Sequence, residues 1–84
     1  MIELTLYTRA GCHLCEEMLA DLASLQAELG FRTTPIEVGW EGPLAERYGQ
    51  LLPVLCMGQQ EICHYFLDVD ALRGALRPEG GSMR

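Results

Sequence analysis

The sequence predicts a single small α/β domain in which one mixed β-sheet is covered by helices on both faces. Strand-like and helix-like stretches alternate in the order strand, helix, strand, helix, strand, strand, helix. The first strand–helix–strand unit needs a crossover connection, and this makes its two strands parallel. A short turn joins the last two strands, so they must be antiparallel. A chain of 84 residues has room for only one such domain.

The first strand and the long helix after it have clear periodicities. Residues 2–7 alternate between apolar and polar side chains, which predicts a strand. Residues 8–11 break this alternation. From Leu14 to Leu29, apolar side chains recur every three or four residues, which predicts an amphipathic helix. Gly30 is the expected end of that helix.

The second strand and the second helix are shorter. Residues 31–38 are rich in β-branched side chains and predict a strand, but Pro35 lacks a backbone N–H. We therefore expect this strand at an edge of the sheet. Gly42-Pro43 is typical of a helix start, so residues 44–48 predict a short helix that Gly49 ends.

The last elements are a hairpin and a helix. The apolar run 52–57 and residues 60–63 predict two strands around a turn at Gly58-Gln59. Asp68 is the expected cap of a final helix that stops before Pro78.

These boundaries predict one domain over residues 1–77. The glycine- and serine-containing residues 78–84 are expected to form a flexible tail.

The composition and the first residues indicate which partners are disfavoured and where in the cell we expect the protein. Twelve acidic residues against six arginines give a net charge of −6, which disfavours nucleic acid and anionic membranes because both would be repelled. No apolar run reaches the ~18 residues of a membrane span. The first residues lack the basic and apolar segments of a signal peptide, so we expect a cytoplasmic protein.

The sequence Cys12-His13-Leu14-Cys15 carries the strongest chemical signal. It lies where the first strand gives way to the first helix, and its spacing brings both sulfurs to one side of a helical turn. Backbone N–H groups at the helix start stabilise a thiolate, so we expect a lowered pKa for Cys12. We predict that Cys12 attacks a disulfide and that the more buried Cys15 resolves the mixed disulfide.

Two other interpretations remain open. The CxxC pair could be half of a metal site completed by Cys56, Cys63 and His64, although a second closely spaced cysteine pair is missing. The domain could also be a binding module with little turnover that holds a partner in a groove beside Pro53 and Trp40. Cys56 and Cys63 are expected to be buried apolar side chains on the hairpin, with Cys63 diagonal to Cys56 across the strands.

The stretch from Leu6 to Cys15, LYTRAGCHLC, followed about forty residues later by LPVL at 52–55, resembles the glutaredoxins of the thioredoxin superfamily. Glu16-Glu17 and the late segment 62–65 are similar to the small bacterial glutaredoxin-like proteins. The resemblance covers residues 2–76. It implies a four-stranded mixed sheet of order 4-3-1-2 in which strand 3 is antiparallel to the others.

The resemblance also implies roles for individual residues. Cys12 would be the nucleophile and Cys15 the resolving thiol, and Pro53 would be a cis-proline that turns the backbone of Leu52 toward the sulfurs. Arg9 stands where glutaredoxins often have a lysine that meets a glutathione carboxylate, and a guanidinium suits that task. His13 joins these residues as a candidate substrate contact.

The implied activity is thiol–disulfide exchange on protein disulfides or glutathione mixed disulfides. No tightly bound cofactor or metal is expected, and glutathione is the candidate co-substrate. We expect a monomer. Cys63 and His64 replace the glycine pair that lets glutaredoxin backbone approach glutathione, and their side chains would crowd that approach.

Overall fold

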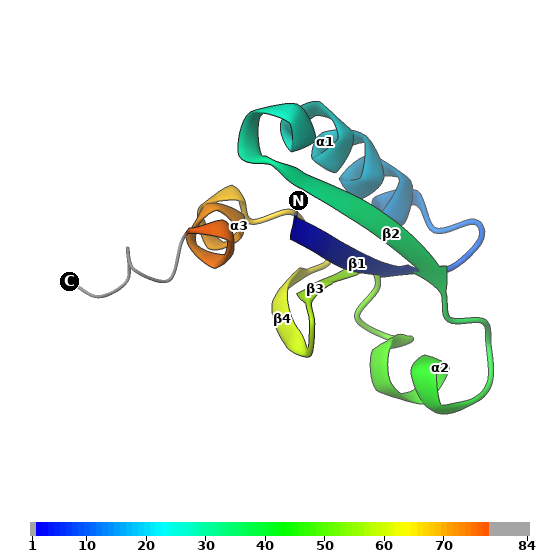
Figure 1. Ribbon diagram of the computed structural model, residues 1–84. Coiled ribbons are helices and arrows are strands. Elements are labelled where there is room, and N and C mark those ends of the chain that lie inside the picture. The colour runs from blue at the N-terminus through cyan, green and yellow to red at the C-terminus, as the bar shows by residue number, and fades with distance from the viewer. Residues whose placement is uncertain (1, 78–84) are drawn as a thin grey trace.

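A computed structural model describes residues 2–77; the tail predicted over 78–84 lies outside the described residues. The elements follow the predicted order (Figure 1). Their bounds are β1 Ile2–Thr8, α1 His13–Leu29, β2 Phe31–Glu37, α2 Pro43–Tyr48, β3 Val54–Met57, β4 Gln60–His64 and α3 Val69–Leu76. Within this described part, no helix is long and apolar enough to cross a membrane.

The four strands form one mixed sheet in the order β2-β1-β3-β4. β1 runs parallel to β2, and β3 runs antiparallel to both β1 and β4. This confirms the sheet order that the resemblance implied. It also confirms the edge position expected for the strand with Pro35, since β2 ends the sheet.

Two apolar clusters attach the helices to the sheet. The first contains Leu6 of β1, Met18 of α1 and Leu72 of α3, each no more than 2% exposed. The second lies toward α2, where the ring of Tyr48 stacks on Tyr7 with centroids 4.1 Å apart. In Figure 1, α2 lies on the side of the sheet away from α1. The sheet is thus packed on both faces.

The predicted ends of the helices are present. Gly30 adopts the left-handed conformation, with φ 76°, and its N–H donates to the carbonyl of Gln26, which closes α1. The carboxylate of Asp68 accepts from the N–H of Ala71 and caps α3. The end of α1 sets where β2 begins, so this cap helps to place β2 beside β1.

One prediction about the hairpin is wrong. Cys56 faces Glu61 as expected, but the register shifts between Leu55 and Cys56, so Cys63 pairs with Leu55 and is not diagonal to Cys56. The irregularity adds one residue to the β4 side, and this turns the Cys63 side chain to the other face. Cys63 therefore belongs to the cluster under α1 and α3, whereas Cys56 belongs to the cluster toward α2.

Candidate active site

Cys12 and Cys15 are joined by a disulfide at the start of α1, with their Cα atoms 5.2 Å apart. Cys12 is the N-cap residue, with extended backbone, and its Sγ accepts the N–H of Cys15 at 3.1 Å. Cys15 is 2% exposed, while Cys12 is only half-buried. An attacking partner can therefore reach the first sulfur more easily than the second.

The helix start favours negative charge on the Cys12 sulfur. Unpaired N–H groups and the positive end of the helix dipole meet at the N-cap, and the Cys15 N–H already points at this sulfur. Glu17 opposes this effect, but it lies in solvent and pairs with His13 at 3.1 Å. Exposed charges act weakly beside a direct N–H contact. His13 is itself largely exposed, one residue from the reactive sulfur.

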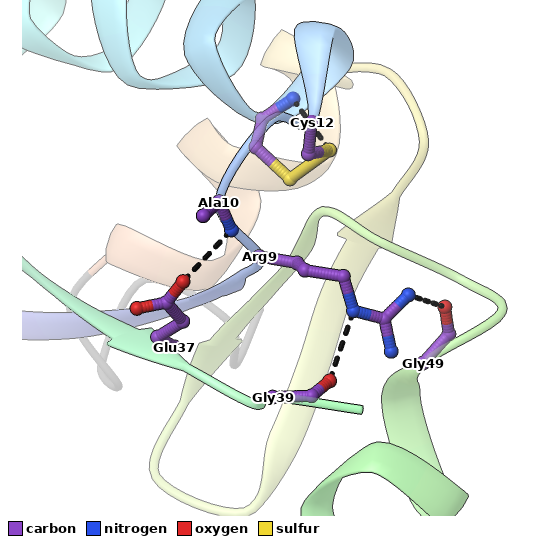
Figure 2. Close-up of a disulfide and its surroundings, with 7 residues drawn as sticks. Arg9, Ala10, Cys12, Glu37, Gly39 and Gly49 are labelled. Atoms are coloured by element: carbon purple, nitrogen blue, oxygen red, sulfur yellow. Dashed lines mark hydrogen bonds between the residues drawn. A yellow bond between two sulfur atoms is a disulfide. The ribbon is translucent and has the colours of Figure 1, made fainter. Parts of the chain in front are cut away.

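Arg9 ties the loop before Cys12 to two other segments. Its Nε donates to the carbonyl of Gly39 at 2.9 Å and its Nη1 to that of Gly49 at 3.4 Å (Figure 2). The guanidinium lies over the ring of Trp40, 3.9 Å from the centroid. A Cβ on Gly49 would clash with the carbonyl oxygen of Ala45 and would also lie 3.0 Å from Nη2 of Arg9, so a glycine fits here. Arg9 thus positions the loop in addition to facing the cleft.

Glu37 supports the same loop from the end of β2 and is not among the predicted site residues. Its carboxylate accepts the backbone N–H of Ala10 at 2.8 Å (Figure 2). The signal that could have found it is the parallel register, in which Glu37 pairs with Thr8 and so ends beside the loop. A local pattern around Glu37 does not contain this information.

A cleft of about 280 Å³ opens beside Cys12, and Arg9, Trp40, Gln50 and Leu52 line it. The Leu52–Pro53 peptide bond is cis, as the resemblance implied. Within the described residues, neither the N–H nor the C=O of Leu52 makes a backbone hydrogen bond. The lining of the cleft thus includes Cys12 and a residue whose backbone donor and acceptor are both free.

The residues of the metal hypothesis do not come together. Cys56 and Cys63 lie in different clusters, and Nδ1 of His64 pairs with Glu61 at 2.6 Å. Across residues 2–77, no group of three or more histidine, cysteine or acidic side chains could hold a metal ion. The site therefore offers a pair of sulfurs and a cleft, which is suited to thiol exchange.

The thiols of Cys56 and Cys63 should make the folded protein less stable as the pH rises into the alkaline range. Burial raises the pKa of Cys56 and of Cys63, and the carboxylate of Glu61 acts in the same direction on both. Such a thiol contributes fully to the free energy of unfolding while the pH is below its pKa in the unfolded chain. The contribution is lost as the pH rises from that value toward the higher pKa in the folded protein, because the thiol of the unfolded chain ionises first. We expect the urea midpoint to fall between about pH 8 and 10.

The matched control for this expectation is Cys63→Ala, which removes one buried thiol. The midpoint of this variant should fall less steeply over the same pH range, whatever its value at pH 7. Equal slopes for the two proteins would contradict the assignment of the pH dependence to Cys63.

The sheet order, the cis-proline and the cysteine pair at the helix start define a thioredoxin-like protein. Residues 3–77 match the Glutaredoxin-like domain (DUF836), and the chain belongs to this family. Uncharacterized proteins of Mycobacterium bovis and Mycobacterium tuberculosis are 36% identical over 77 residues, covering 84% of this chain and 78% of theirs.

The solved structures that are similar to this one include two bacterial proteins. The solution NMR structure of a Nitrosomonas europaea protein has a TM-score of 0.80 and 40% identity, covering 90% of this chain and 92% of that one. The X-ray structure of an X. campestris protein has a TM-score of 0.64 and 34% identity, covering 89% and 99%. The family and the cysteine pair together support a redox-type role on a thioredoxin-like fold.

Proposed function

We propose that the protein is a thiol–disulfide oxidoreductase that reduces protein disulfides or glutathione mixed disulfides through Cys12 and Cys15. The observation that carries this proposal is the position of the disulfide. Its first sulfur caps a helix and borders an open cleft, while the second is buried one turn behind. This is the geometry that a dithiol exchange needs.

The reaction proceeds by two exchanges at sulfur. The Cys12 thiolate attacks one sulfur of the substrate disulfide, and the other sulfur leaves as a thiolate that takes up a proton. The Cys15 thiol then loses its proton and attacks Sγ of Cys12, which releases the second substrate sulfur as a thiolate. The substrate is reduced by two electrons and the Cys12–Cys15 disulfide forms. Two molecules of an external thiol, for which glutathione is the candidate, then reduce the Cys12–Cys15 disulfide in two further exchanges and leave as their own disulfide, which returns the enzyme to its dithiol form.

Four other residues would help to bind the substrate. The free N–H and C=O of Leu52 would pair with the backbone on either side of the substrate sulfur, with Pro53 fixing their direction. Arg9 would attract a substrate carboxylate into the cleft, and His13 would contact the part of the substrate that lies over the helix start.

A trapped intermediate tests the proposal. The Cys15→Ser variant cannot release what Cys12 captures, so it should accumulate a mixed disulfide with oxidised glutathione or a disulfide peptide. Intact-protein mass spectrometry gives the added mass, and peptide mapping should place it on the fragment with Cys12. If neither compound forms an adduct there, or if the adduct lies on Cys56 or Cys63, the proposal fails.

A further inference from the structure

A second hollow lies along the start of α1, the helix that Cys12 caps. It measures about 180 Å³ and runs between the first turns of α1 and the segment that joins β4 to α3. Leu14, Glu17, Met18 and Asp21 line it from the helix, and Tyr65 and Phe66 line it from the other side. We refer to this hollow as the α1 groove.

Tyr65 joins the α1 groove to the cleft. Its phenol donates to the carbonyl of Gln50 at 3.0 Å, and Gln50 lines the cleft beside Cys12. Its backbone N–H donates to the carbonyl of Pro53 at 3.0 Å. Tyr65 also has a φ of 65°, the left-handed region, which these contacts must hold because a tyrosine does not favour it. The residue thus lines the α1 groove and is hydrogen-bonded to a segment that lines the cleft.

The α1 groove lies at a distance from Cys12 that a short stretch of one substrate chain can span. Glu17 lies five residues after Cys12, which is ~7.5 Å along a helix at 1.5 Å per residue. An extended peptide covers that length in about two or three residues. A substrate whose cysteine sits at Cys12 can therefore place a nearby side chain in the α1 groove.

The lining combines apolar surface, aromatic rings and negative charge. Met18 is 2% exposed at the base of the groove, while Phe66 is 68% exposed. Glu17 and Asp21 lie one helical turn apart, and Asp21 pairs with no arginine or histidine among residues 2–77. A lysine or arginine side chain matches this set, because its stem covers apolar surface and its cation can meet both carboxylates and rings.

We propose that the α1 groove binds a lysine or arginine side chain two or three residues from the reactive cysteine of a protein substrate. This inference rests on the proposed function and specifies its substrate class. Arg9 lines the cleft beside Cys12, whereas Glu17 and Asp21 line the α1 groove, so the two hollows carry opposite charge and orient the substrate chain. Glutathione has no cationic side chain with an aliphatic stem, so the groove favours proteins over glutathione.

Two disulfide-linked peptides of equal length test this inference, one with lysine and one with glutamate three residues from the cysteine. The wild-type protein should reduce the lysine peptide about threefold to tenfold faster in kcat/KM, given the modest strength of exposed ion pairs and cation–π contacts. The E17Q/D21N variant should lose most of this preference. The Phe66→Ser variant should lose part of it, since Phe66 supplies an exposed ring.

The control must separate the groove from the overall negative charge of the protein. The E46Q/D70N variant removes the same number of charges from α2 and α3, outside the groove. It should keep the wild-type preference. Equal rates for the two peptides in the wild-type protein, or an equal loss of preference in both double variants, would overturn the inference.

Failure of the proposed function gives a different result. In that case neither peptide would be reduced and the Cys15→Ser variant would form no adduct with either of them. Reduction of both peptides at the same rate would leave the oxidoreductase intact and remove only the assignment of the α1 groove.

Discussion

The Cys12→Ser variant should lose all measurable disulfide reduction while keeping its fold. In the proposed mechanism the Cys12 thiolate is the attacking group, and a serine hydroxyl stays protonated at neutral pH even at a helix start. Cys12 is half-buried and lies at the N-cap, where serine is itself a favoured residue, so the substitution costs little stability relative to the reduced wild-type protein, which also lacks the Cys12–Cys15 disulfide. The measurement is the steady-state reduction of a disulfide peptide, with circular dichroism to follow folding.

The companion variants divide the roles of the thiols. Cys15→Ser should still carry out the first exchange and then stop as a mixed disulfide. Cys63→Ser should keep close to wild-type activity, because Cys63 is buried in the cluster under α1 and α3. Residual turnover in the Cys12→Ser protein would show that another thiol attacks the substrate.

The elements of the fold could be predicted because their signals are local. Alternation over residues 2–7 and the apolar stripe from Leu14 to Leu29 each fix an element without knowledge of its neighbours. Pro35 adds one piece of long-range information, because a residue without an N–H suits an edge strand. The order of the whole sheet needed the family resemblance as well.

The details around the hairpin and the active-site loop could not be predicted in this way. The register shift between Leu55 and Cys56 depends on how two strands pair, and it decides which face Cys63 occupies. The hydrogen bond from Ala10 to Glu37 joins positions 27 residues apart. Such contacts follow from three-dimensional register, so a pattern within one segment does not contain them.

The loop before Cys12 is therefore held on two sides by consecutive residues. Ala10 donates to Glu37 at the end of β2, and Arg9 reaches the carbonyls of Gly39 and Gly49. Sequence reasoning assigned Arg9 only to the substrate. The structure shows that Arg9 also positions the loop before Cys12. A role in substrate binding and a role in positioning predict different effects of substituting Arg9.

The Arg9→Met variant should lower kcat/KM for a glutathione mixed disulfide about 10- to 100-fold. Hydrogen bonds to a charged group contribute roughly 1.5–3 kcal/mol, and each ~1.4 kcal/mol changes a rate tenfold. Methionine keeps an unbranched side chain beside Trp40 but removes the guanidinium over the ring, the donors to Gly39 and Gly49 and the charge facing the cleft. Urea unfolding of the same variant measures how much of the change is structural.

Two comparisons distinguish positioning from substrate binding. Arg9→Lys keeps the charge but lacks the planar fork that reaches both carbonyls, so it should recover attraction of a carboxylate more than stability. A comparison of substrate peptides with a free and an amidated C-terminus then measures only the attraction between the Arg9 cation and the substrate carboxylate. If the wild-type protein treats these two peptides equally while Arg9→Met still loses activity, Arg9 acts through the loop that presents Cys12 and does not bind the substrate.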